Sequence, residues 1–294
     1  KYLNPSFSVD DPIMELKKSF GYQDFRQGQT EIIQKILANE NVLAVMPTGA
    51  GKSLCYQLPA IISKRATIVV SPLVSLIDDQ AKGLKENGIE VAKIHSGQDR
   101  ETNIKNWKLF TSGIAKLLYL SPERLMQERM LSALKKYLIG SFVVDEAHCI
   151  SKWGAAFRPD YEALSKLKDI FPDASIAAFT ATADKQTRND ISNKLAVKKL
   201  NVIVQGFDRP NLFLEVRQKD SLKPALLSYL KQRQGVNGIV YCLSRRETDD
   251  LADFLSANGF NALAYHAGKS SKYRREVYDK FVTFTSKKYL KKIE

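Results

Sequence analysis

Seven short apolar runs in the first two thirds of the chain constrain its fold more than any other feature. They begin near residues 41, 66, 90, 115, 141, 175 and 201. Each run is continuously apolar, where a strand with one face in water would alternate apolar and polar residues. Strands buried on both faces are typical of a parallel sheet covered by helices. The runs therefore predict a parallel sheet.

Helical segments stand between these runs. In "TEIIQKILANE", for example, Ile32, Ile33, Ile36 and Leu37 form one apolar stripe. Alternating strands and helices predict a doubly wound α/β domain, which we place at residues 1–207. The pattern breaks at Gly206 and Pro210 and then resumes with apolar runs at 238 and 261. A further run near 211 is less clear. We expect residues 208–294 to form a second α/β domain that is incomplete.

The composition points to a soluble intracellular protein with an anionic partner. The chain has 294 residues and a net charge of +13. Such an excess indicates a polyanion such as nucleic acid, although a solvated basic surface would give the same number. No apolar run is long enough to span a membrane. Three scattered cysteines and three scattered histidines favour neither a disulfide framework nor a zinc site.

The segment "MPTGAGKSLCY" at 46–56 has the pattern of a phosphate-binding loop between a strand and a helix. Its glycines permit a backbone that turns N–H groups toward phosphate oxygens. Lys52 is expected to bind the terminal phosphates and Ser53 to bind Mg²⁺. Met46 stands where the general pattern has glycine. A chance glycine-rich turn is the alternative. The nucleotide-binding residues expected here are Thr48, Gly49, Ala50, Gly51, Lys52 and Ser53.

The segment "FVVDEAH" at 142–148 supplies the acids that such a loop requires. Asp145 is expected to hold Mg²⁺, and Glu146 to orient and deprotonate the attacking water. An ordinary acidic strand end is the alternative. Lys52, Asp145 and Thr180 all follow predicted strands, as does the Ser71–Pro72 pair. Ligands bind at the carboxyl edge of open α/β sheets, so the sequence predicts one site for ATP and Mg²⁺.

Several longer motifs resemble the RecQ family of superfamily-two DNA helicases. They are "FGYQDFRQGQ", "GKSLCYQLPA", "SPLVSLIDDQ", "DEAHCISKWGAAFRPDY" and "FTATA", and the resemblance runs from about Phe20 to about Phe281. It implies a RecA-like P-loop domain followed by a second, incomplete RecA-like domain. It also implies a DNA-dependent ATPase that binds single-stranded and partly duplex DNA and moves 3′ to 5′.

The resemblance also assigns roles around the nucleotide. Tyr22 would stack on adenine, Gln29 would hydrogen-bond its edge, and Arg26 would lie near the phosphates. Core packing is the alternative for Tyr22. Thr180 would couple hydrolysis to movement along DNA.

DNA contacts are implied in both domains. Phosphate contacts give affinity without sequence preference, and aromatic side chains stack on the bases of single strands. Two departures from the family stand in the aromatic-rich loop: Lys152 replaces glutamine, and Ala155–Ala156 replace His-Asp. His266 is left open between a functional and a surface role. The residues expected to bind DNA are Ser71, Ser75, Arg124, Trp153, Phe157, Arg158, Ser244 and Arg245.

The family pattern stops near Phe281, ahead of the strand and the arginine motif that the family carries next. We therefore expect a chain truncated within the second domain. An arginine finger contributes roughly 10³–10⁵ in rate, so a slow ATP- and DNA-binding module is the alternative to a helicase motor core. The expected location is the cytoplasm or nucleoid of a bacterium, or the nucleus of a eukaryote, without membrane contact.

Overall fold

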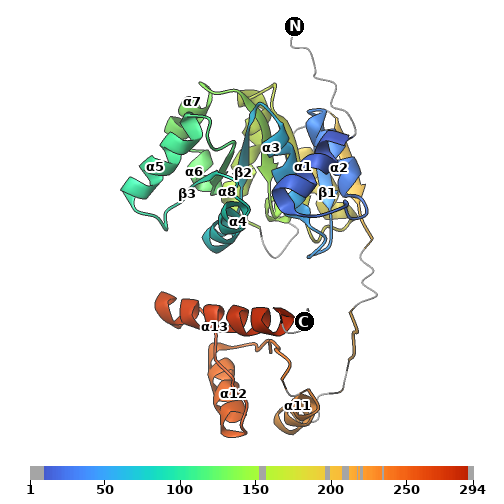
Figure 1. Ribbon diagram of the computed structural model, residues 1–294, viewed down its shortest axis with the longest axis vertical. Coiled ribbons are helices and arrows are strands. Elements are labelled where there is room, and N and C mark those ends of the chain that lie inside the picture. Colours follow the sequence, from blue (N-terminus) through green and yellow to red (C-terminus); the bar gives the residue numbers. More distant parts are fainter. Residues whose placement is uncertain are drawn as a thin grey trace. The chain divides into compact units, whose positions relative to one another are not determined.

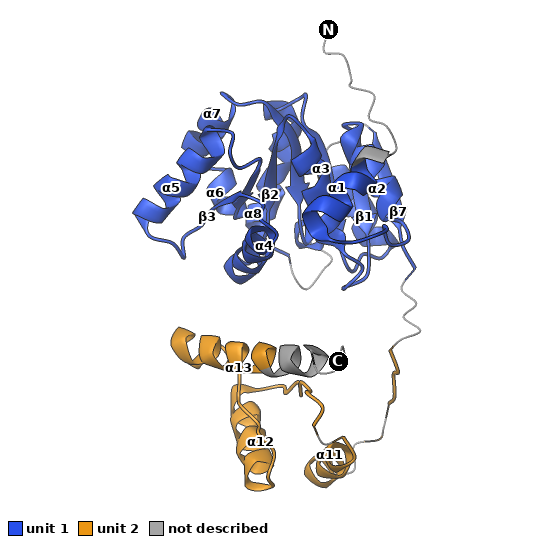
Figure 2. Ribbon diagram, viewed as in Figure 1, with its two compact units in different colours: residues 1–209 blue, residues 210–294 orange. Residues whose placement is uncertain are grey.

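The computed structural model describes residues 10–151, 157–195, 199–206, 212–216, 218, 221–233 and 235–290. The chain divides into two compact units, Lys1–Arg209 and Pro210–Glu294 (Figure 2). We call them unit 1 and unit 2 and describe each by itself.

Unit 1 is built on a parallel sheet whose strand order is β3-β4-β2-β5-β6-β1-β7 (Figure 1). Every strand pair that forms the sheet is parallel. The seven predicted strands are confirmed. Their bounds are β1 Asn41–Val45, β2 Ala66–Val70, β3 Val91–Ile94, β4 Leu117–Leu120, β5 Ile139–Val144, β6 Ser175–Thr180 and β7 Leu200–Val204.

Helices cover both faces of this sheet, so the predicted doubly wound arrangement is also confirmed. The helices are α1 Asp10–Phe20, α2 Gln29–Leu37, α3 Lys52–Ile62, α4 Val74–Glu86, α5 Arg100–Thr111, α6 Pro122–Leu125, α7 Glu128–Leu134, α8 Pro159–Glu162, α9 Leu167–Ile170 and α10 Lys185–Lys194, with short 3-10 helices η1 Ala147–Ile150 and η2 Ala163–Lys166.

Two apolar clusters form the core, one on each face of the sheet. Successive strand residues point to opposite faces, and Val42 and Leu43 accordingly belong to different clusters. One cluster joins the sheet to α1, α2, α3 and α4. The other joins it to α5, α6, α7 and α10. All residues of β5 and β6 are buried, whereas the edge strand β7 is partly exposed.

Unit 2 contains α11 (Leu222–Lys231), α12 (Arg245–Ala257) and α13 (Ser271–Leu290). The strands predicted near 211, 238 and 261 are wrong for the part of unit 2 that the structure describes, because no ladder forms there. A strand is stable only when a neighbour accepts its backbone hydrogen bonds. Without one, Tyr241 is 92% exposed and Tyr265 54% exposed. The predicted third helix forms and extends to Leu290.

Within the described ranges, no helix combines the length and the apolar character that crossing a membrane requires.

The same substitution should have very different costs at the centre and at the edge of this sheet. Val69 of β2 is fully buried, whereas Val202 of β7 is 48% exposed. We expect Val69→Ala to lower the free energy of unfolding by about 2 kcal/mol, and Val202→Ala by less than half of that. Urea unfolding of both variants measures the difference. Equal losses would contradict this difference in burial.

Candidate functional site

The order of the strands brings distant parts of the sequence to one edge of unit 1. The loop after β1, the acids after β5 and the threonine that ends β6 follow three consecutive strands of the sheet. The segments after β2, β4 and β3 follow the three strands on its other half. The carboxyl edge of the sheet therefore has two halves, and each carries its own set of polar side chains.

The loop between β1 and α3 has the backbone geometry of a phosphate cradle. Gly49 and Gly51 have φ angles of 81° and 80°, which strain residues with a Cβ atom. Helix α3 starts at Lys52, and the Lys52 Nζ donates to the Met46 carbonyl at 3.2 Å. The predicted residues 48–53 thus lie together at the N-terminus of a helix, which favours anions.

Met46 replaces the usual glycine without strain in the loop. Positive φ among non-glycine residues of the described chain is confined to Asn39 and Glu146, so this position does not need glycine. The Met46 side chain is fully buried, and its sulfur lies 4.0 Å from the Cys55 Sγ. The methionine therefore contributes to the core beneath the loop.

The start of α2 and the turn before it are hydrogen-bonded to the same loop. Gln29 is 1% exposed, and its Nε2 donates to the carbonyls of Ala50 and Gly51 at 3.1 and 3.2 Å. The Arg26 Nη1 donates to the Gly49 carbonyl at 2.6 Å. Tyr22 is 54% exposed, so core packing does not account for its ring. Arg26 and Gln29 thus adjoin the phosphate loop, and their roles toward adenine stay predictions.

Asp145 is held at the end of β5 by contacts on several sides. Its N–H donates to the Val70 carbonyl at 2.9 Å, and its carbonyl accepts from the Tyr161 hydroxyl at 3.1 Å. Its Oδ1 accepts from the Glu146 N–H at 3.0 Å. The pKa of this carboxyl is raised to about 6, chiefly by burial and then by the neighbouring Glu146 charge, against the lowering effects of the Glu146 N–H and Lys52. The site thus holds a buried acid that a cation would stabilise in its charged form.

Glu146 is bonded to β6 through a histidine. Its backbone is left-handed, with φ 49° and ψ 45°, a conformation that costs a residue with a Cβ about 1–2 kcal/mol. The His148 Nδ1 lies 3.3 Å from the Glu146 Oε2 and 3.0 Å from the Thr180 Oγ1. The Thr180 hydroxyl in turn donates to the Thr182 carbonyl at 3.1 Å.

The sequence reasoning missed His148 and Tyr161 as parts of this site. His148 stands three residues after Asp145 in "DEAH", and this spacing on a turn after a strand was the available signal. Tyr161 gave no local signal, because its hydroxyl reaches the Asp145 carbonyl from a separate helix, α8.

The residues predicted to bind DNA in unit 1 lie on the other half of the edge. Ser71 follows β2, Ser75 is exposed on α4, and Arg124 lies on α6, the short helix after β4. Arg158 connects the two halves, because its Nη1 donates to the Pro72 carbonyl at 2.8 Å and its N–H donates to the Cys149 carbonyl at 3.0 Å. Phe157 lies under Lys194, whose Nζ is 5.5 Å from the ring centroid.

Other predicted DNA residues are not brought into this group. Trp153 lies outside the described residues, as do the departures at Lys152 and Ala155–Ala156. Ser244 and Arg245 belong to unit 2, where they begin α12. The Ser244 Oγ accepts from the Glu247 N–H at 3.1 Å and so caps that helix. Arg245 is exposed beside it.

The donor groups present fit a magnesium–nucleotide complex. Carboxylate and hydroxyl oxygens are the ligands that Mg²⁺ prefers, and Asp145 and Ser53 supply one of each. The Asp145 carboxylate is 7% exposed, and the Glu146 N–H is the hydrogen bond that it accepts in the described structure. Lys52 and the glycine loop supply the positive partner for phosphate.

Comparison with known sequences yields a family. A family model for DEAD/DEAH box helicases matches residues 26–191. The ATP-dependent DNA helicase RecQ of Haemophilus influenzae is 42% identical over 266 residues, which cover 90% of this chain and 43% of that protein. The RecQ-like DNA helicase BLM of Xenopus laevis is 41% identical over 276 residues, which cover 90% of this chain and 20% of that protein. The predicted resemblance to RecQ helicases is confirmed, and the chain spans less than half of each relative.

Comparison with solved structures supports the fold class. The DUF1998 helicase MrfA bound to DNA and AMPPNP has a TM-score of 0.70 and 18% sequence identity, covering 93% of this chain and 42% of that protein. The DEAD-box helicase Mss116 bound to ssRNA and UDP-BeF has a TM-score of 0.68 and 18% sequence identity. The match covers 94% of this chain and 64% of that protein. These identities bear on fold alone, and they confirm the predicted RecA-like α/β class.

Burial of Asp145 should make the stability of the chain depend on pH. Its folded pKa of about 6 lies above the ordinary 3.8, so the folded state retains a proton that the unfolded chain releases between these values. Stability is therefore lost as pH rises through this window. We expect Asp145→Asn to stabilise the chain by on the order of 1–3 kcal/mol above about pH 6.5, and by little near pH 4.

Thermal unfolding of both proteins across this pH range, without nucleotide or metal, measures the effect. Asp79→Asn is the control, because Asp79 is exposed on α4. A gain in stability of Asp145→Asn that is the same at every pH would contradict a raised pKa at Asp145.

Proposed function

The chain belongs to the DEAD/DEAH box helicase family, and from that premise we propose that it is the motor core of an ATP-dependent DNA helicase of RecQ type. On this proposal, residues 1–207 form the ATP-binding helicase domain and residues 208–294 form part of a second RecA-like domain. The partners proposed are single-stranded and partly duplex DNA.

One observation carries this proposal. The glycine loop, the two acids and Thr180 follow the adjacent strands β1, β5 and β6, while the residues expected to bind DNA follow β2 and β4 on the same edge. Nucleotide and nucleic acid would then bind side by side on one rigid sheet. The 42% identity to an ATP-dependent DNA helicase RecQ supports DNA as the polymer.

The residues that follow β1, β5 and β6 have separate roles in the proposed hydrolysis of ATP. Bound Mg²⁺ neutralises charge on the phosphates, and Ser53 and Asp145 are the residues that would hold it. Lys52 and the backbone N–H groups of the loop bind the phosphates. Glu146 orients the attacking water and accepts its proton. The positive φ of Glu146 turns its side chain away from the line of β5, toward the His148 bond.

Two contacts offer a route between hydrolysis and DNA. His148 contacts both Glu146 and Thr180. A movement or change of charge at the Glu146 carboxylate would therefore alter the contacts of Thr180 at the end of β6. Arg158 bonds the Pro72 carbonyl, so the loop that follows the acids is tied to the DNA-binding segment after β2. Movement along DNA from 3′ to 5′ is the direction that the RecQ resemblance implies.

A second candidate function is an ATP- and DNA-binding module with slow turnover. It is favoured by the absence of a strand ladder from the described residues of unit 2. Catalytic side chains in α/β domains stand on strand ends held by such ladders. The two candidates differ in whether DNA accelerates ATP hydrolysis.

ATP turnover with and without single-stranded DNA tests the proposal. A motor core should hydrolyse ATP at least about tenfold faster when DNA is present, whereas the module should bind both ligands with little turnover. Glu146→Gln should retain Mg–ATP binding while turnover falls about 10²–10⁴-fold, because the general base is removed. Lys52→Ala should lose nucleotide binding, because the ammonium on the terminal phosphates is gone.

The controls separate the parts of this proposal. Glu123→Gln, an exposed acid on α6, should leave turnover unchanged. Normal ATP binding by Lys52→Ala would place the phosphate site elsewhere. With partly duplex DNA, the same preparation should separate strands that carry a 3′ tail and leave 5′-tailed strands paired. The reverse preference would refute the proposed direction.

A further inference from the structure

Two helix-and-turn segments, one in each unit, repeat each other at a constant distance along the chain. Helices α4 and α12 each have 13 residues, and Arg245 stands 171 positions after Val74 where the second begins. The same offset relates Asp249 to Asp78, Leu255 to Leu84, Asn258–Gly259 to Asn87–Gly88, His266 to His95 and Gly268 to Gly97.

The side-chain contacts repeat as well. The His95 Nε2 lies 3.1 Å from the Asp78 Oδ1, and the Gly97 N–H donates to the His95 Nδ1 at 3.2 Å. Because Nδ1 accepts this bond, the proton of the neutral ring is on Nε2 and is donated to Asp78.

Unit 2 holds the same bonds. The His266 Nε2 lies 3.1 Å from the Asp249 Oδ2, and the Gly268 N–H donates to the His266 Nδ1 at 3.1 Å. We call each of these groups of three residues, Asp78–His95–Gly97 and Asp249–His266–Gly268, a histidine clamp.

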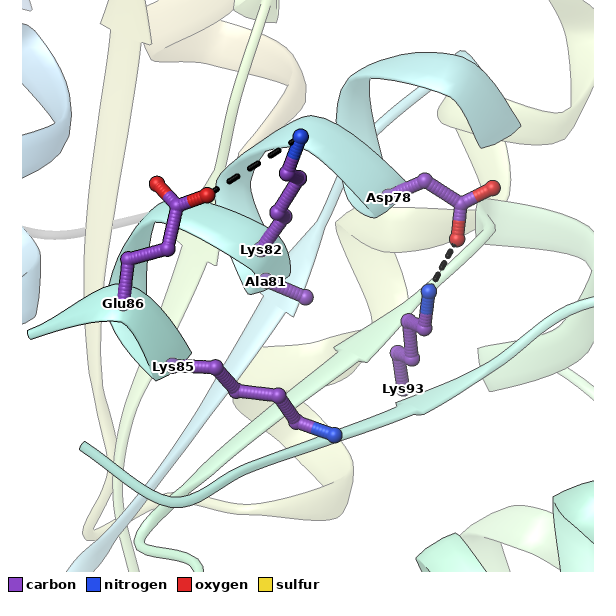
Figure 3. Close-up of a pocket in the computed structure, with 6 residues that line it drawn as sticks. All are labelled: Asp78, Ala81, Lys82, Lys85, Glu86 and Lys93. Atoms are coloured by element: carbon purple, nitrogen blue, oxygen red, sulfur yellow. Dashed lines mark hydrogen bonds and ion pairs between the residues drawn. The ribbon is translucent and has the colours of Figure 1, made fainter. Parts of the chain in front are cut away.

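A lysine shares the carboxylate of each clamp. Asp78 forms an ion pair with Lys93, and Asp249 pairs with Lys269 at 2.8 Å. Figure 3 shows the Asp78–Lys93 pair, with Lys93 on β3, and the Lys82–Glu86 pair along α4. These residues line a pocket of about 340 Å³. The pocket lies between α4 and β3. Asp78 thus joins α4 to β3, and Asp249 joins α12 to the turn that contains Lys269.

Each clamp holds a glycine against the first residue of the helix. A Cβ on Gly97 would lie 3.2 Å from both the His95 Nδ1 and the Val74 Cγ1. A Cβ on Gly268 would lie 3.1 Å from the His266 Nδ1 and 3.4 Å from the Arg245 Cδ. The close approach of the histidine ring and the first helix residue therefore explains the glycine in both turns. The turn in this way packs against the first residue of the helix.

These helix starts bear the residues proposed to bind DNA. Ser75 is the second residue of α4, and Arg245 follows the capping Ser244 on α12. No side chain caps α4 at Leu73, so its first N–H groups remain for another acceptor. Two residues earlier, Ser71 is 1% exposed and its hydroxyl has no hydrogen-bond partner in the described structure. Both features suit a phosphate oxygen.

We propose that His95 and His266 are positioning residues for DNA, each fixing a helix start on which the phosphate backbone is bound. This inference rests on the proposed function, since it takes DNA as the ligand. The histidines themselves do not touch the polymer. They hold Gly97 and Gly268 in place, and through them Val74 and Arg245, so that Ser75 and Arg245 can each bind a phosphate without first being ordered.

Alanine substitutions at neighbouring aspartates test the clamps with matched charge. Asp78→Ala and Asp249→Ala break the clamps. Asp79→Ala and Asp250→Ala are the controls, because each removes one carboxylate from the next position of the same helix. We expect the clamp variants to bind a single-stranded oligonucleotide about 3–10-fold more weakly than their controls. The slope of log K against log salt should flatten by about 0.7 for Asp249→Ala, because Arg245 would no longer neutralise a phosphate, and it should stay at the control value for Asp78→Ala, because Ser75 carries no charge.

A purely structural role would leave the slope of Asp249→Ala at its control value, so this slope separates positioning from stability. Mg–ATP affinity without DNA should be unchanged in all four variants, which shows that unit 1 remains folded. Asp78→Asn and Asp249→Asn retain an acceptor oxygen and should restore most of the DNA affinity. In the unaltered chain, ¹⁵N NMR of His95 and His266 should show the Nε2–H tautomer.

Two outcomes would overturn the inference, and they differ. If the unaltered chain binds DNA and the clamp variants match their controls in affinity and salt slope, the positioning role is refuted and the proposed function stands. If the unaltered chain binds no single-stranded DNA at any salt concentration, the proposed function fails, and the positioning role fails with it.

Discussion

Parallel pairing in one sheet is the constraint on which the rest of unit 1 depends, because it directs every strand to end at the same edge. The backbone ladder continues past the strands into the functional loops. The Met46 N–H donates to the Thr180 carbonyl, the Asp145 N–H to Val70, and the Ser71 N–H to Leu120. Each functional loop therefore leaves the sheet at a fixed register, and residues far apart in sequence meet without a long search through loop conformations.

The sequence predicted this framework because burial on both faces leaves a signal that is local. A run such as "FVVDEAH" shows its strand, its end and its acids within seven residues. The spacing of "DEAH" places His148 near the acids, but it does not show which atoms of Glu146 and Thr180 the histidine contacts. These contacts depend on the left-handed backbone at Glu146 and on the register between β5 and β6. The bond from Gln29 to the loop carbonyls likewise joins segments that only tertiary structure brings together.

The failed strand predictions in unit 2 have a physical cause that unit 1 makes visible. There β2 and β3 do not pair with each other, because β4 lies between them and pairs with both. The repeat of 171 positions relates β2 to residues 237–241 and β3 to residues 262–265. The counterpart of β4 begins at residue 288, at the end of α13 and not in a strand. Apolar sequence is necessary for a buried strand, but only a neighbouring strand satisfies its backbone.

The two acids that follow β5 are energetically unfavourable, one because its carboxyl is buried and the other because its backbone is strained. Asp145 is charged above a pKa of about 6 despite its burial, and Glu146 holds an unfavourable backbone conformation. Both follow β5, a strand that is buried at every residue and paired on both sides. A cation bound there would relieve the cost of the buried carboxylate, so ligand binding and folding stability are linked through the same side chain. The position proposed for hydrolysis is thus held, at a cost, next to a strand that is completely buried and paired on both sides.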